Sequence, residues 1–163
     1  MRLRRRLLSA GVLLPFVTLA QLVQAQSADT VRWKDVALLD GRVITASELT
    51  GKTVVVEFWA SWCPFCARQN PLIEKLHRSR GGKGLVVLTF SIDKTEDDAR
   101  NYMRKHGYTF AAAMASPQTE RWFGVRRGLP ELFVVDPEGR IVFRERGELF
   151  EEDVAALARF ATN

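Results

Sequence analysis

The pattern of apolar and polar residues along the chain first shows two runs with almost no polar alternation. They are Thr53–Trp59 (TVVVEFW) and Leu85–Ile92 (LVVLTFSI), and such runs are typical of strands that are covered on both faces. Between them, apolar residues recur at helical spacing and predict a helix from Cys63 to about His77. The centre of the chain is therefore expected to run strand, helix, strand.

The flanking segments extend this alternation. Asp40-Gly41 stands between Val36–Leu39 and Arg42–Ile44, and it predicts a hairpin because Asp-Gly is a strong turn signal. Further helices are predicted over Ala46–Leu49, Thr95–His106, Pro117–Phe123 and Glu151–Phe160, and further strands over Phe110–Met114, Leu132–Val135 and Arg140–Arg146. Strands that alternate with helices and end in a late hairpin predict an α/β fold, with a central mixed sheet and helices on both faces.

Residues 1–25 have the three parts of a secretory signal peptide. A basic stretch over Met1–Arg6 precedes a mostly apolar run over Leu7–Val23, and small or apolar residues stand before a possible cut after Ala25. We therefore expect an exported, periplasmic protein whose folded part is one domain over residues 26–163.

An uncleaved membrane anchor is the competing interpretation of the leader. The apolar run is close to the roughly 17 to 25 residues that span a bilayer, although Pro15 and the polar residues near its end disfavour a durable span. Contact with a membrane is expected only through this segment.

The charge balance removes an apparent hint of nucleic-acid binding. The chain has 24 basic and 19 acidic residues, but four of the arginines lie in the leader, so the remainder is almost neutral. The content of 47% hydrophobic and 26% charged residues is ordinary for a globular domain; it excludes a collagen-like or low-complexity chain and gives no support for wholesale disorder. Two cysteines are too few for a disulfide-dense scaffold.

These two cysteines, Cys63 and Cys66, directly follow a predicted buried strand and open a predicted helix. Free N–H groups and the positive end of the helix dipole favour a thiolate at Cys63, which we expect to be the exposed nucleophile toward disulfides of partner proteins. Cys66, one turn further, would be the buried thiol that resolves the mixed disulfide. Pro64 suits the first helical turn, and Trp62 is expected to form an apolar rim against a partner.

Other uses of a cysteine pair are open to the same residues. A structural disulfide over so short a loop contributes about 2 kcal/mol in the chain-entropy model, and a domain of this size does not need it. A zinc site usually requires four ligands, and the remaining candidates, His77 and His106, lack motif spacing. We therefore predict no metal and no other cofactor.

A protein that binds a cargo through the two thiols, such as copper or an apocytochrome during cytochrome c assembly, is the alternative from another functional class. A copper carrier is expected to add a third soft ligand near the pair. The nearest methionines after the leader are Met103 and Met114, far along the chain from the cysteines.

The segment Glu57–Cys66 (EFWASWCPFC) resembles the active-site strand and loop of thioredoxin-like proteins, and the wider pattern resembles the exported TlpA/ResA-type thiol–disulfide oxidoreductases. The matching elements are Asp40-Gly41, Leu49–Lys52, Asn70-Pro71, Val125, Gly128–Pro130, Leu132–Asp136 and Gly139. The resemblance extends from about Val36 to Phe160. It implies a thioredoxin-like fold with an N-terminal hairpin extension.

The same resemblance implies an activity and its partners. The chain would exchange disulfides with protein thiols, and a membrane or periplasmic thiol would supply its electrons. The resemblance favours a reductase over an oxidase, whereas the residues alone leave both directions open. It further implies a cis peptide between Leu129 and Pro130, opposite the cysteines, as part of a substrate groove. We expect Trp62, Pro64 and Phe65 to contribute to this groove.

Glu57 occupies the position of the buried acid of thioredoxins, six residues before the first cysteine. The resemblance implies that it accepts a proton from Cys66. The alternative is a carboxylate at the rim of the strand, paired with a lysine or arginine. The chain departs here from the TlpA/ResA pattern, which often has Asn at position 57 and an acid at the position of Gln69.

Three other features receive plainer interpretations. His77 and His106 are expected on surface helices, with His106 at a helix C-terminus. Arg126-Arg127 is expected in a solvated loop. The alternative is that these arginines set which charge is preferred on the partner protein. The aromatic residues expected in the core are Phe123, Phe133 and Phe143.

Overall fold

The computed structural model describes residues 30–80 and 84–161 of the 163-residue chain. The predicted leader over residues 1–25 lies outside this part, as does the expected domain boundary at residue 26. Among the described helices, none is both long and apolar enough to cross a bilayer.

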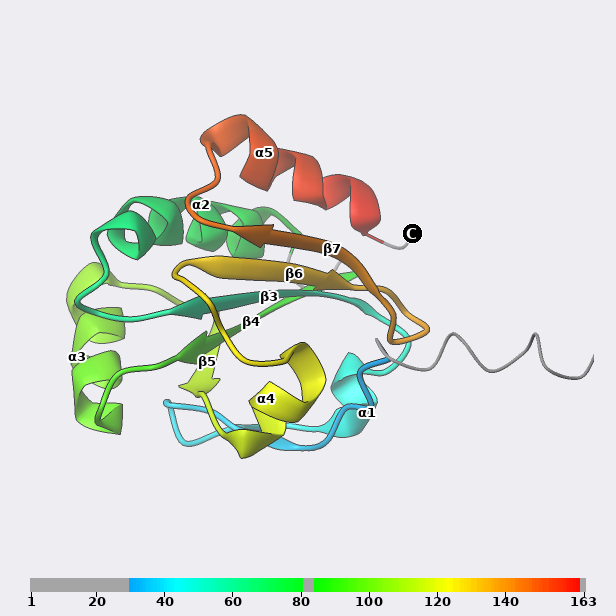
Figure 1. The fold of residues 1–163 in the computed structure, drawn as a ribbon, viewed down its shortest axis with the longest axis horizontal. Coiled ribbons are helices and arrows are strands. Elements are labelled where there is room, and N and C mark those ends of the chain that lie inside the picture. Colours follow the sequence, from blue (N-terminus) through cyan, green and yellow to red (C-terminus); the bar gives the residue numbers. More distant parts are fainter. Residues whose placement is uncertain (1–29, 81–83, 162–163) are drawn as a thin grey trace, which may run out of the picture.

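A five-stranded sheet forms the centre of the fold, in the order β5–β4–β3–β6–β7 (Figure 1). Strands β3, β4 and β5 are parallel, whereas β6 is antiparallel to both β3 and β7. The bounds are β3 Thr53–Trp59, β4 Leu85–Ser91, β5 Ala111–Met114, β6 Glu131–Val135 and β7 Ile141–Arg146. The predicted mixed sheet is confirmed.

A small antiparallel hairpin precedes the sheet, as the Asp-Gly turn predicts. Its strands are β1 Val36–Ala37 and β2 Val43–Ile44, shorter than the apolar runs in the sequence. In the turn, the Gly41 N–H donates to the Leu38 carbonyl (3.0 Å), and Gly41 has a φ of +88°, a conformation that favours glycine.

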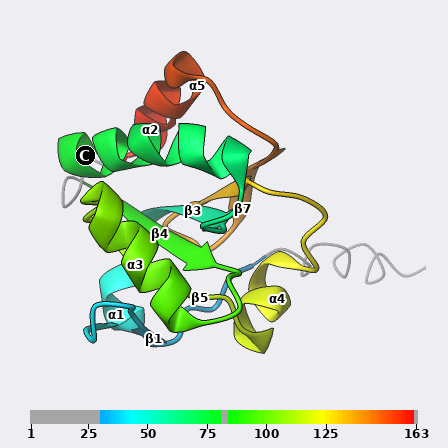
Figure 2. The ribbon, with the colours of Figure 1, turned by 90° about the vertical axis from the view of Figure 1, so that its left-hand side faces the viewer.

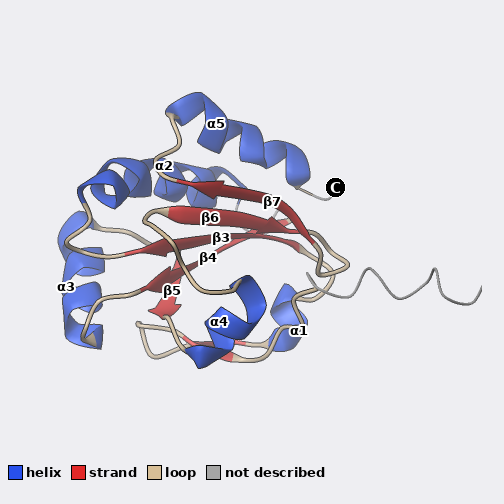
Figure 3. Cartoon of the chain, viewed as in Figure 1, coloured by secondary structure: helices blue, strands red, loops and turns tan. Residues whose placement is uncertain are grey.

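Helices cover both faces of the sheet (Figures 2 and 3). Side chains of α2, α3 and α5 pack in the apolar cluster on one face, and those of α1, α4 and the hairpin pack on the other. The bounds are α1 Ala46–Leu49, α2 Pro64–Arg80, α3 Glu96–His106, α4 Pro117–Phe123 and α5 Glu151–Ala156.

Two helices differ from the prediction at their C-terminal ends. Helix α2 continues beyond His77 to Arg80, because no helix-breaking residue stands between His77 and Gly81. The predicted helix over 151–160 is α-helical only to Ala156 and then tightens into a 3₁₀ turn, Leu157–Phe160, as terminal turns often do.

All seven side chains of β3 are buried, so the predicted two-sided cover of this strand is confirmed. Val55 and Trp59 pack in the cluster under α2, whereas Val56 and Phe58 pack in the cluster under α4. Because side chains alternate along a strand, Glu57 points to the α2 side, the side on which the cysteines lie.

The expected aromatic core is only partly present. Phe123 and Phe133 are buried and pack with their ring centroids 4.8 Å apart. Phe143 is only half-buried, because it lies on the edge strand β7, where it packs beside Phe160.

Candidate active site

Cys63 and Cys66 form a disulfide at the N-terminal end of α2. Cys63 is the N-cap rather than the first helical residue that the sequence predicts, since its carbonyl accepts the first helical hydrogen bond from Ala67 N–H (3.0 Å). Its Sγ accepts a hydrogen bond from the Cys66 backbone N–H (3.1 Å), as the side chain of an N-cap residue does. A backbone donor and the helix dipole therefore both favour negative charge on this sulfur.

The two sulfurs differ little in exposure. Cys66 is fully buried, and Cys63 keeps only 4% of its surface exposed. The predicted order of accessibility holds, but the expected exposure of Cys63 is wrong for this disulfide form. The reason is that Cys63 packs in the apolar cluster that also contains Trp59 and Leu132.

Large apolar side chains flank the cysteines at the surface. Trp62 is 65% exposed and Phe65 is 51% exposed, and the exposed Pro64 lies between them as the first residue of α2. The Phe65 ring lies 4.8 Å from the guanidinium carbon of Arg68. Trp62, from which the sequence predicts an apolar rim against a partner, is thus exposed beside the cysteines, and Phe65 is exposed with it.

The loop before β6 reaches the same end of the sheet. The Leu129–Pro130 peptide is cis, as the resemblance implies. Strand β6 begins at Glu131, opposite Phe58, so this peptide lies beside the end of β3, from which the chain continues to the cysteines. Leu129 packs against the apolar cluster that holds both cysteines.

Glu57, in β3 near this end of the sheet, is fully buried. Its Oε1 accepts a hydrogen bond from Gln69 Nε2 at 2.7 Å. Burial raises the pKa of Glu57 to about 8, although the hydrogen bond from Gln69 acts in the opposite direction. The alternative of a rim carboxylate paired with a cation is wrong, because no ion pair of residues 30–80 and 84–161 includes Glu57.

Two buried amides of α2 adjoin this carboxylate. Gln69 Oε1 accepts from the backbone N–H of Leu149 (2.6 Å), and Asn70 Nδ2 lies 3.5 Å from the Tyr102 hydroxyl. With its amide turned over, Asn70 donates to Glu57 Oε2 (3.3 Å) and to the Cys66 carbonyl (3.2 Å). From the sequence alone, Gln69 is recognised only as a departure from a family pattern. The available signal was a pair of uncharged polar residues one turn after Cys66, on the side of the helix that faces the core.

A second buried carboxylate, Glu131, directly follows the cis peptide and was not predicted. It is 1% exposed, and its Oε1 accepts from Arg144 Nη2 (2.8 Å), with Arg146 Nε at 3.8 Å. Its Oε2 has no hydrogen-bond partner among residues 30–80 and 84–161. A charged residue at the start of the apolar run ELFVV was the signal for it.

Arg126, expected in a solvated loop, is largely covered instead. Its side chain is 20% exposed, and its guanidinium carbon lies 5.0 Å from the centre of the Phe58 ring. The aromatic face attracts the cation, which explains why the arginine folds inward.

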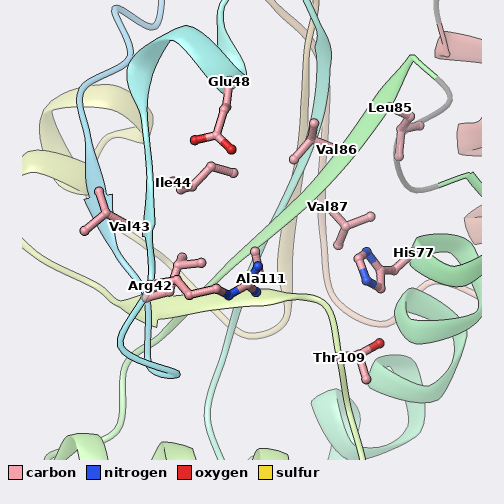
Figure 4. A pocket seen from close by; sticks show the side chains of 11 residues that line it. Arg42, Val43, Ile44, Glu48, His77, Leu85, Val86, Val87, Thr109 and Ala111 are labelled. Atoms are coloured by element: carbon pink, nitrogen blue, oxygen red, sulfur yellow. The ribbon is translucent and has the colours of Figure 1, made fainter.

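A cavity of about 610 Å³ lies at the opposite end of the sheet (Figure 4). Leu85, which begins β4 opposite Thr53, lines it, whereas the cysteines follow the other end of β3. None of the predicted site residues lines this cavity. His77 lines it and is half-buried rather than on a free surface, and this burial lowers its pKa.

The structure therefore brings Cys63, Cys66, Glu57, Leu129 and Pro130 to one end of the sheet, with exposed rings around them. Within residues 30–80 and 84–161, no group of three or more His, Cys, Asp or Glu side chains is arranged to hold a metal ion. A buried acid beside a helix-capping cysteine pair has the parts that proton-coupled dithiol–disulfide exchange requires.

Comparison with known proteins gives one family and a consistent set of relatives. The profile of the Redoxin family matches residues 23–159. The thiol-disulfide oxidoreductase ResA of Bacillus thuringiensis is 29% identical over 125 residues, which cover 76% of this chain and 72% of ResA. A thiol:disulfide interchange protein DsbE homolog of Paracoccus denitrificans is 34% identical over 122 residues, which cover 72% of this chain and 64% of the homolog.

Solved structures show the same likeness. A thiol:disulfide interchange protein DsbE from Chlorobium tepidum superimposes with a TM-score of 0.68 at 28% identity, covering 81% of this chain and 92% of that one. A second thioredoxin family protein from Chlorobium tepidum has a TM-score of 0.76 at 23% identity, covering 84% and 98%, and supports the fold.

Proposed function

This chain belongs to the Redoxin family and is a thioredoxin-like thiol–disulfide oxidoreductase of the ResA/DsbE type, and from this membership we propose that it reduces disulfides of partner proteins outside the cytoplasm. Cys63 is the attacking thiol, Cys66 the resolving thiol and Glu57 the proton acceptor. Trp62, Pro64, Phe65, Leu129 and Pro130 receive the partner polypeptide.

The reaction consists of two exchanges. In the first, the Cys63 thiolate attacks one sulfur of the partner disulfide, a Cys63–partner disulfide forms, and the other partner sulfur leaves as a thiolate that takes a proton. In the second, Cys66 gives its proton to Glu57 and attacks Cys63 Sγ, so that the Cys63–Cys66 disulfide forms and the second partner sulfur is released. Two electrons have then passed to the partner.

A membrane or periplasmic dithiol donor returns the enzyme to its reduced form. It attacks the Cys63–Cys66 disulfide, becomes a disulfide itself and leaves both cysteines as thiols, with the proton on Glu57 returning to Cys66. The signal-peptide pattern of residues 1–25 supports a site of action outside the cytoplasm.

The buried Glu57 is the observation that carries the proposal. A structural disulfide has no need of a fully buried carboxylate beside it, and burial of this group is unfavourable unless it has a task. Its pKa of about 8 is close to that of an ordinary thiol, about 8.5, so the proton can pass in either direction at little cost.

The reduction potential of the Cys63–Cys66 pair tests the direction of the reaction. The oxidised and reduced forms can be trapped and counted after equilibration in glutathione buffers of known potential. A reductase is expected to lie nearer to thioredoxin, at about −270 mV, than to the oxidant DsbA, at about −120 mV. A potential close to that of DsbA would overturn the proposed direction.

A further inference from the structure

The orientation of the Gln69 amide is fixed by a backbone group. Gln69 is fully buried in α2, and its Oε1 accepts from the Leu149 N–H at 2.6 Å, between β7 and α5. A backbone N–H can only donate, so turning the amide over would place two donors face to face. The Nε2–H of Gln69 therefore always points to Glu57 Oε1, 2.7 Å away.

The other carboxylate oxygen has a partner that can adapt. The Asn70 amide atom that faces Glu57 lies at 3.3 Å from Oε2 and 3.2 Å from the Cys66 carbonyl. With nitrogen inward, Asn70 donates to both Oε2 and the Cys66 carbonyl. With oxygen inward, Asn70 accepts from a protonated Oε2 but places its own oxygen against the Cys66 carbonyl oxygen, which also can only accept. The outer end of the amide faces the Tyr102 hydroxyl at 3.5 Å, a group that either donates or accepts, so both orientations keep a polar neighbour.

The two tyrosines near Glu57 add no competing charge near neutral pH. Tyr102 on α3 and Tyr108 after it feel the negative charge of Glu57, but their pKa values are raised, chiefly by burial, and that of Tyr108 reaches about 12. Strands β4 and β6 place Thr89 and Leu132 beside it in register.

Two further charges lie on the elements around Glu57. Asp93, after β4, is held by the Ser61 and Ser91 hydroxyls at 2.7 Å each. Glu148, next to Leu149, is paired with Arg68 at the surface. On α2 itself, Cys66 is the thiol that exchanges its proton with Glu57 in the proposed reaction.

We propose that Gln69 is a positioning residue for the exchange: it holds Glu57 Oε1 as a permanent acceptor and thereby directs the proton to Oε2, the oxygen that shares Asn70 with the Cys66 carbonyl. This inference rests on the proposed role of Glu57 as the proton acceptor. Its consequence is that the buried acid presents its proton on the side of the resolving cysteine without reorientation.

The titration of Glu57 in the Gln69→Leu variant tests the hydrogen bond directly. The carboxyl carbon of Glu57 is followed by ¹³C NMR in the disulfide form, in which the cysteines do not titrate. We expect its pKa to rise by about one to two pH units, because Gln69 makes the hydrogen bond that favours the ionised form. Arg68→Gln is the control. It breaks the surface pair with Glu148, which lies on the same loop as Leu149, and leaves Gln69 in place. An unchanged Glu57 pKa in folded Gln69→Leu would overturn the proposal.

A measurement on the unaltered protein covers the case in which this variant does not fold. Across the titration, the Gln69 side-chain NH₂ signals should keep the low-field position of a hydrogen-bonded donor, whereas those of Asn70 should change with the midpoint of Glu57. Gln118 on α4 serves as the control for direct pH effects. Loss of the Gln69 hydrogen bond when Glu57 is protonated would place the proton on Oε1 and overturn the proposal.

The proposed function fails in a different way. The pH profile of disulfide exchange in Gln69→Leu should move together with the pKa of Glu57. If the pKa moves and the exchange profile does not, Gln69 still positions Glu57, but Glu57 is not the proton acceptor.

Discussion

The backbone N–H of Cys66 points at Sγ of Cys63, 3.1 Å away, so the second cysteine supplies a donor that stabilises charge on the first. Because this donor belongs to the backbone, replacing the Cys66 side chain leaves it in place. The attacking sulfur can therefore be studied without its resolving partner.

We expect Cys66→Ala to accumulate mixed disulfides with partner proteins, because the Cys63 thiolate still forms and nothing resolves the adduct. Cys63→Ala should accumulate none, since Cys66 is fully buried and lies one turn inside the helix, whereas it is Cys63 Sγ that accepts the backbone hydrogen bond at the helix cap. Non-reducing gels of cells that express each variant provide the measurement. Faster alkylation of Cys66 than of Cys63 in the reduced protein would reverse the assigned roles.

The exposed rings beside the cysteines should matter for proteins and not for small disulfides. Trp62→Ala and Phe65→Ala remove side chains that are 65% and 51% exposed, so little stability is lost. We expect each to raise KM for a protein disulfide several-fold while the reduction rate of a small aromatic disulfide stays within about twofold, since each ring contributes on the order of 1 kcal/mol of contact. Val43→Ala, exposed on β2 at the far end of the sheet, is the matched control. If both variants reduce the protein disulfide and the small disulfide equally more slowly, the rings act in the exchange step and not in binding of the partner protein.

Much of this architecture could be predicted because it depends on local patterns. The two-sided burial of TVVVEFW, the Asp-Gly turn and the Cys63–Cys66 spacing each concern residues that are close in sequence. The acidic first turn of α3, capped by Thr95, follows from the same kind of signal.

The missed features depend on contacts between distant segments. Gln69 accepts a hydrogen bond from the backbone N–H of Leu149, which lies 80 residues further along the chain. No local sequence pattern shows that this donor lies next to Gln69. Arg126 folds over Phe58 from a loop that looked solvated, because an aromatic face lies at that point of the sheet. Such contacts arise only once the sheet order is known, so they could not follow from periodicity or spacing.

Glu131 gives a prediction about stability. Its buried carboxylate depends mainly on Arg144, because Arg146 is a longer 3.8 Å away. Arg144→Leu would leave a buried charge with a poor partner, and we expect a loss of about 1 to 3 kcal/mol in the free energy of unfolding, below the cost of breaking a fully buried pair because Arg144 is half-exposed. Urea unfolding measures it.

Arg42→Leu is the control for this experiment. Its partner Asp40 is at the surface, and both side chains are at least half-exposed, so the effect should be below about 1 kcal/mol. If Arg144→Leu is equally mild, then water or another arginine satisfies Glu131, and the pair with Arg144 is not what holds it.

The free energy of unfolding should decrease with rising pH because of Glu57. Its folded pKa of about 8 lies above its unfolded value of about 4.5, so between these values the folded state binds one more proton than the unfolded state. The contribution of this group to the free energy of unfolding is therefore fully present below pH 4.5, falls as the pH rises, and is lost above pH 8. The total loss is on the order of a few kcal/mol.

Glu57→Gln should remove this dependence. The variant is expected to melt at a higher temperature than the natural protein at pH 8 to 9, because an amide carries no charge to bury, and the difference should shrink toward pH 5. The same change should slow insulin reduction at about pH 8, on the order of tenfold or more, since Cys66 loses its proton acceptor. Glu152→Gln, exposed at the start of α5, should change neither quantity. A carboxylate with a purely structural role would give the opposite pair of results, a lower melting temperature and an unaltered rate. Exchange kinetics that stay unchanged across the pH range would exclude Glu57 as the proton carrier, whatever the stability did.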